Sequence, residues 1–184
     1  AQGSVDEAVS IAEVYKDTGS VSQISQMILL ASMIKDGQTE AFLNFVKNAS
    51  EITPILKDLL SAWIRMGLDD EVNANRIFEK IAKVQGMGQF ANFHRAMSQL
   101  AAGKGDQAQR TFDLIHSDQA NPTRRSVIYH TKILLSQSKF KEAQQLLEKW
   151  FGPTFDPEIE ELYVNAANEK IYPTSLFPKT DIAV

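Results

Sequence analysis

The sequence predicts an all-helical protein of about ten helices that form a row of helical hairpins. Three observations support this fold class. Five alanines recur at steps of 33, 33, 34 and 35 residues: Ala8, Ala41, Ala74, Ala108 and Ala143. An apolar residue lies four positions after each of them: Ala12, Phe45, Phe78, Phe112 and Leu147. Apolar residues elsewhere follow helical spacing, and repetition at this period is typical of stacked two-helix units.

Helix-ending and helix-starting residues divide the chain into the expected elements. Glycine adopts the left-handed conformation that commonly ends a helix, and five glycines lie at expected ends: Gly19, Gly37, Gly67, Gly86 and Gly103. A capping residue followed by proline starts a helix at Thr53-Pro54, Asn121-Pro122 and Asp156-Pro157. The expected helices span 5–17, 22–36, 38–48, 53–67, 69–85, 89–103, 105–117, 123–138, 140–151 and 156–169.

These helices predict one repeat domain over 1–170 and a tail or linker over 171–184. The short connections favour antiparallel hairpins near 22–48, 53–85, 89–117 and 123–151. Half-hairpins remain at 5–17, which carries the alanine of a second helix, and at 156–169, which resembles a first helix. We therefore expect the chain to be part of a longer array. Pro173 and Pro178 prevent a continuous helix in the tail, which is expected to cap the last hairpin or to be a loose linker.

The composition excludes several classes of protein. The apolar share is 43%, the net charge is −4 and cysteine is absent. Without cysteine there are no disulfides, thiolate metal sites or cysteine nucleophiles. No apolar run is long enough to span a membrane, and the negative net charge argues against nucleic acid as a partner. Basic residues are concentrated in 61–150, between two acidic ends.

The spacing of small and aromatic residues resembles the tetratricopeptide repeat. The best copy spans 89–122 and combines Ala96, Gly103, Ala108, Phe112 and Pro122. This resemblance implies a right-handed superhelix whose first helices line a concave face that holds peptides or proteins. It implies no catalytic residue and no cofactor. The similarity extends to exported bacterial repeat proteins, which favours an exported or periplasmic location.

Two positions depart from the family pattern. Asn92 and Arg95 stand where its first helix normally carries an aromatic residue and a large apolar residue. A HEAT-like array, or an unclassified array of helical pairs, therefore stays open.

Residues with reactive side chains do not form a recognisable catalytic or metal-binding pattern. His94, His116 and His130 are not paired at metal-ligand spacing on one helix, and we expect each at the surface or rim. Two Ser-x-x-Lys matches, Ser32–Lys35 and Ser136–Lys139, lack the companion elements of penicillin-interacting enzymes. We predict no enzyme, no metal and no cofactor.

The candidate partner-binding residues are basic side chains of the first helices. They are Arg65, His94, Arg95, Arg124, Arg125 and His130. A positive stripe of this kind would bind an acidic peptide or a carboxylate terminus, because guanidinium pairs bidentately with carboxylate. The competing prediction is an apolar groove for an amphipathic helix, formed by Phe90, Phe93, Met97 and Leu100. The same four residues would otherwise belong to the core.

The predicted function is a non-enzymatic scaffold that binds a protein or peptide. The alternative is a helical accessory or oligomerisation domain of a larger enzyme or of a secretion or envelope assembly. Self-association through the exposed ends of the array is a further possibility.

Overall fold

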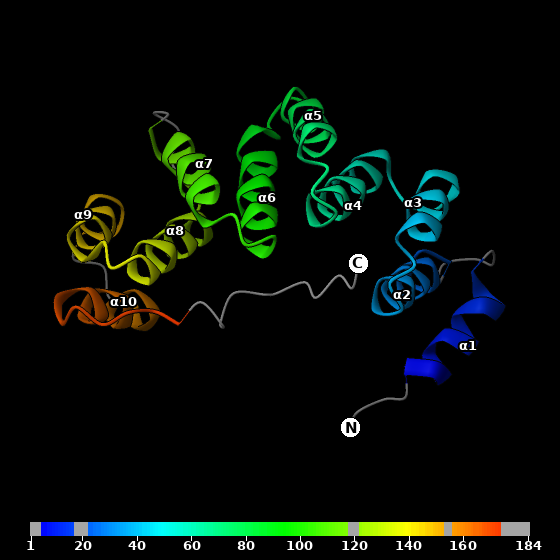
Figure 1. Ribbon diagram of the computed structural model, residues 1–184, viewed down its shortest axis with the longest axis horizontal. Helices are drawn as coiled ribbons and strands as arrows, with labels where there is room; N and C mark the ends of the chain where they lie inside the picture. The colour runs from blue at the N-terminus through cyan, green and yellow to red at the C-terminus, as the bar shows by residue number, and fades with distance from the viewer. Residues whose placement is uncertain (1–4, 17–21, 118–121, 153–155, 174–184) are drawn as a thin grey trace. The chain divides into compact units, whose positions relative to one another are not determined.

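The computed structural model describes residues 5–16, 22–117, 122–152 and 156–173, and every regular element in these ranges is an α-helix (Figure 1). The helices are α1 (Val5–Tyr15), α2 (Ser22–Lys35), α3 (Thr39–Asn48), α4 (Pro54–Gly67), α5 (Glu71–Ala82), α6 (Gly88–Ala101), α7 (Gly105–Ser117), α8 (Arg124–Ser136), α9 (Phe140–Phe151) and α10 (Pro157–Ala167). Each predicted helix boundary lies within three residues of the observed one. The all-helical fold class and the ten helices are confirmed for the described residues.

The helices form two compact units, with α1 to α5 in the first and α6 to α10 in the second. Within each unit, helices that follow one another in the chain pack together. In the first unit α4 packs on α5, and α2 packs on both α1 and α3. In the second unit α6 packs on α7, α8 packs on α9, and α10 contacts both α8 and α9. Packing between chain neighbours is the arrangement expected for an array of helical hairpins.

One turn geometry recurs after every second helix, from α2 to α10. A residue with a left-handed backbone follows each of these helices, with φ values of 68°, 63°, 76°, 60° and 52° at Gly37, Asp69, Gly103, Ser138 and Glu169. In all five turns the next backbone N–H donates to the carbonyl oxygen five residues earlier, at 2.8 or 2.9 Å. This is the Schellman bond that closes a helix end. The turns therefore mark one repeating unit, 31 to 35 residues long.

Buried residues recur at fixed separations along the sequence from this left-handed residue. Seven residues before it, the side chain is at most 2% exposed in every copy: Leu30, Ala62, Ala96, Thr131 and Leu162. Five residues after it, the side chain is equally buried in four copies: Phe42, Ala74, Ala108 and Ala143. Both helices of each pair thus bury the same relative positions.

The predicted alanine register is wrong in α3 by one residue. Ala41 is exposed, whereas Phe42 and Val46 are buried. They occupy the places that Ala74 and Phe78 take in α5. Ala41 lies four residues after its left-handed residue instead of five, and one residue rotates a helical side chain by about 100°. The alanine period alone does not reveal this offset.

Helices begin after two of the three predicted capping residues, but only one of these two makes a side-chain capping bond, and the third site differs. Thr53 precedes Pro54 at the start of α4, without a side-chain capping bond. At the start of α10, the carboxylate of Asp156 accepts hydrogen bonds from the next helix backbone. Asn121 lies outside the described residues, and α8 instead begins after Thr123, whose hydroxyl accepts from the N–H of Ser126. Pro122 thus precedes the helix and does not lie in its first turn.

The beginning of the predicted tail is ordered against the second unit. Residues 171–173 are not helical, and Tyr172 packs against a core formed by α8, α9 and α10. Lys132 Nζ lies 5.5 Å from the centre of the Tyr172 ring. Residues 174–184 lie outside the described part of the chain. No helix in the described ranges has the length and apolar character needed to cross a membrane.

Candidate partner-binding site

The six predicted binding residues lie in both units. Arg65 belongs to α4 in the first unit, and the other five belong to α6 and α8 in the second. Arg65 Nη1 lies 2.6 Å from Asp70 Oδ2. Asp70 caps the start of α5, and its pKa is lowered by the hydrogen bond from Asn73 and then by that from Arg65. The charge of Arg65 therefore stabilises the turn between α4 and α5.

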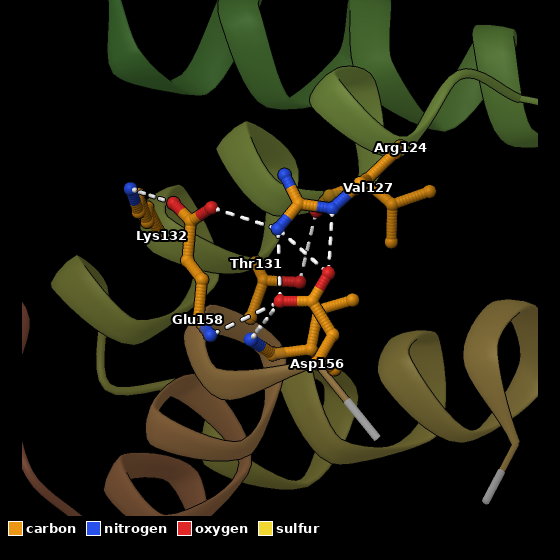
Figure 2. Close-up of polar contacts among 7 residues, drawn as sticks. Arg124, Val127, Thr131, Lys132, Asp156 and Glu158 are labelled. Carbon is orange, nitrogen blue, oxygen red and sulfur yellow. Dashed lines mark hydrogen bonds and ion pairs between the residues drawn. The ribbon is translucent and has the colours of Figure 1, made fainter. Parts of the chain in front are cut away.

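Arg124 connects the beginning of α8 to the beginning of α10. Its guanidinium donates to both carboxylate oxygens of Asp156, at 2.7 and 2.9 Å, and to Glu158 at 3.0 Å (Figure 2). Lys132, two turns later on α8, donates to the other oxygen of Glu158 at 3.0 Å. Arg124 holds the pKa of Asp156 low, and Lys132 is the largest influence lowering that of Glu158. This network uses the charge of Arg124 within the unit.

His130 is buried, contrary to the expectation that each histidine lies at the surface or rim. It is 4% exposed, and His116 of α7 is 6% exposed. Their Nδ1 atoms lie 2.8 Å apart, a hydrogen-bond distance. Their other ring nitrogens each lie 3.3 Å from an oxygen, that of Ser126 for His116 and that of Asp113 for His130. Residues of two different helices form this pair, so spacing on one helix could not reveal it.

His94 and Arg125 line one pocket of about 430 Å³ between the N-terminal parts of α6 and α8. Phe90 and Phe93 provide its apolar surface, and Phe90 is 38% exposed. The ring of His94 lies 4.4 Å from that of Phe90 and 5.5 Å from that of Phe93, measured between ring centres. Of the six predicted residues, the structure brings these two together in a concavity. Arg95 is half-buried on α6 and is not part of the pocket lining.

The charge in this pocket comes from Arg125. Burial lowers the pKa of His94, and the positive charge of Arg125 lowers it further, so the imidazole is neutral at pH 7. Arg125 is exposed, and no carboxylate among the described residues forms an ion pair with it. The pocket therefore presents one guanidinium beside aromatic rings.

The two predicted surfaces partly coincide. Phe90 and Phe93 line the pocket, whereas Met97 of the predicted apolar groove is 6% exposed and belongs to the core. The pocket also includes Gly86, Gln89 and Thr123, which were not predicted to bind a partner. Phe90 and His94 are four residues apart, a spacing that places them on one helix face. Their proximity to Arg125 depends on how α6 and α8 pack, which the sequence does not show.

No group of three or more histidine, aspartate or glutamate side chains in the described part of the chain could hold a metal ion. In comparisons with protein-family models, curated proteins and solved structures, the chain matches none.

Proposed function

We propose that the chain is a non-enzymatic scaffold that binds a partner protein through a peptide segment. The single observation that carries this proposal is the pocket in which Arg125 lies beside Phe90, Phe93 and neutral His94. A segment with a carboxylate next to a large apolar side chain would satisfy both parts of the pocket.

The chemistry of the pocket favours this class of partner. A guanidinium offers parallel N–H donors that match a carboxylate, and a charge-assisted hydrogen bond is stronger than a neutral one. Aromatic rings that are partly exposed gain free energy when an apolar side chain covers them. The resemblance of the sequence to tetratricopeptide repeats, whose members hold peptides, favours the same class of partner. A scaffold of this kind requires no catalytic group.

Titration of labelled peptides tests the proposal. The probes are fluorescein-labelled peptides of about ten residues, in a glycine-serine background, with an Asp-Leu pair or an Asn-Leu pair at the centre. We expect fluorescence anisotropy to give a Kd for the Asp-Leu peptide at least about tenfold lower, or about 1.4 kcal/mol of binding free energy. We expect Arg125→Gln to abolish this preference and added salt to reduce it.

Arg110→Gln is the matched control, because Arg110 is an exposed arginine on α7 outside the pocket. It should retain the preference of the wild-type chain. Phe90→Ser should weaken binding of both peptides, since it removes apolar contact area. Equal affinities of the two peptides for the wild-type chain, or equal effects of Arg125→Gln and Arg110→Gln, would contradict the proposal.

A further inference from the structure

His94 is a titratable group in the wall of the pocket that also contains Arg125. Its ring is half-buried and lies 4.4 Å from the ring of Phe90, measured between ring centres. Burial is the larger cause that lowers the pKa of His94, and the positive charge of Arg125 is the smaller one. A ligand that enters the pocket changes both causes, so binding and the protonation of His94 are coupled.

The charged surroundings of His94 come from the opposite side of the pocket. Arg125 belongs to α8 and is the charged group that shifts the pKa of His94. Arg95 follows His94 in the chain, but its side chain is not part of the lining. The helix α7 also packs on α6, and none of its ionisable side chains contributes to this shift. The other side chains of the lining do not ionise: Gln89, Phe90, Phe93 and Thr123.

The proximity of Arg125 to His94 has two consequences. The charge of Arg125 is close enough to disfavour the imidazolium, so a carboxylate bound to that guanidinium is close enough to favour it. An opposite charge within about 4–6 Å commonly changes a pKa by about 1–3. A ligand that carries a carboxylate therefore raises the pKa of His94 relative to the free chain.

The apolar part of such a ligand has the opposite effect on His94. It covers the ring further, and burial disfavours the charged form. The ring is already half-buried, so much of the cost of burial is present before the ligand binds. The negative charge is entirely new to the lining, and we expect its effect to exceed that of the added burial.

We propose that His94 takes up a proton from the solvent when a segment with a carboxylate binds beside Arg125, so that the partner is held more tightly in acid than at neutral pH. The inference rests on the proposed function, because the carboxylate is the group that Arg125 is proposed to bind. In the complex the imidazolium and the guanidinium both attract the carboxylate. The affinity of the pocket for its partner thereby responds to pH.

The direction and the limit of the effect follow from proton linkage. Between the two pKa values of His94 the complex binds more protons than the free chain, so the Kd falls as the pH falls through that interval. One proton changes a Kd by at most about tenfold per pH unit. The chain has two other histidines, His116 and His130. They stay neutral above pH 5.5, because their pKa values are about 4 and about 3.

Calorimetric titration of the full chain with unlabelled Asp-Leu and Asn-Leu peptides at pH 7.5 and pH 5.5 tests the inference. The aspartate of the peptide is ionised at both pH values, since its pKa is about 3.9. We expect the Kd of the Asp-Leu peptide to be at least about threefold lower at pH 5.5. The Asn-Leu peptide brings burial without charge, so its Kd should rise or stay the same. Circular dichroism checks that the chain is folded at both pH values.

The same titrations count the protons directly when they are repeated at pH 6.5 in two buffers of different ionisation enthalpy. Binding of the Asp-Leu peptide should show net proton uptake, and binding of the Asn-Leu peptide should show none. His94→Gln should abolish the uptake and the pH dependence. Arg110→Gln, the control outside the pocket, should retain both.

A Kd of the Asp-Leu peptide that does not fall toward pH 5.5 would overturn the inference, as would proton uptake that persists in His94→Gln. If His94→Gln does not fold, the proton count of the wild-type chain decides, and a count of zero overturns the inference. Equal affinities of the two peptides at pH 7.5 would contradict the proposed function as well. A preference for the Asp-Leu peptide without proton uptake would leave the proposed function intact and overturn only the inference.

Discussion

Phe112→Ala is expected to lower the free energy of unfolding by about 3–5 kcal/mol. Phe112 is 0% exposed and lies on the buried face of α7, the second helix of its pair. Its ring centre lies 6.1 Å from that of Phe93 on α6 and 5.6 Å from that of His130 on α8, on which it stacks. Truncation therefore opens a cavity. It removes contacts of the ring with two neighbouring helices and with its own helix.

Urea unfolding at pH 7 measures this loss. Leu114→Ala on the same helix is the control, because Leu114 is 59% exposed and its truncation removes little packing. That change should cost within about 0.5 kcal/mol. A loss below about 1 kcal/mol for Phe112→Ala would show that the side chain does not belong to the core.

The second large effect is a loss of stability of the second unit between pH 7 and pH 5. Burial and, to a smaller extent, the charge of Lys149 lower the pKa of His116 to about 4. Burial likewise lowers the pKa of His130 to about 3, with smaller contributions from His116 and Lys139. Both rings are therefore neutral in the folded protein at pH 5.

Whether stability rises or falls with pH depends on which state, folded or unfolded, binds more protons. In the unfolded chain both histidines titrate near pH 6.5, so below that pH the unfolded state takes up protons that the folded state does not. Stability therefore falls from about pH 6.5 down to the folded pKa values. Each histidine should contribute a loss on the order of 2 kcal/mol at pH 5. Asp113 faces His130, and burial, followed by the charge of Glu142, raises the pKa of Asp113, so proton uptake by this carboxyl in the folded state opposes the loss.

Tryptophan fluorescence can measure this effect in one unit at a time. The chain has two tryptophans, and Trp63 belongs to the first unit whereas Trp150 belongs to the second. The ring centre of Trp150 lies 6.3 Å from that of His116. In Trp63→Phe, unfolding followed by Trp150 should shift to lower urea at pH 5. In Trp150→Phe, the Trp63 signal should shift much less, because residues 1–83 contain no histidine. Equal shifts in both variants would contradict the assignment to the histidine pair.

Local signals in the sequence predicted the helices well. Gly37 and Gly103 follow helix ends as expected, because a left-handed backbone favours glycine, whereas Gly86 adopts this conformation four residues after the end of α5. Asp69 and Ser138 adopt the same conformation although they are not glycine. The positions of the glycines therefore did not show that the turn is repeated. The one-residue offset at Ala41 was missed because the alanine period does not show where each turn lies.

The candidate site was less predictable, because it depends on contacts between helices. A basic residue on a first helix can face solvent or an acid of another helix, and the sequence does not distinguish these cases. Arg65 pairs with Asp70, and Arg124 pairs with residues more than thirty positions later in the chain. His130 meets His116 across two helices. Arg125 and His94 share a pocket, and whether they bind a partner remains a prediction.

The central claim is that one left-handed turn follows the first helix of every repeating unit. Unfolding free energies of Gly103→Ala and Ser138→Gly test it most directly, since both changes are conformational. A Cβ at Gly103 would meet no atom within 4 Å, and Ser138 is exposed. We predict that Gly103→Ala destabilises the chain by about 1 kcal/mol and that Ser138→Gly stabilises it by about 0.5–1 kcal/mol. An unchanged stability for Gly103→Ala, or a loss of stability for Ser138→Gly, would contradict the shared turn.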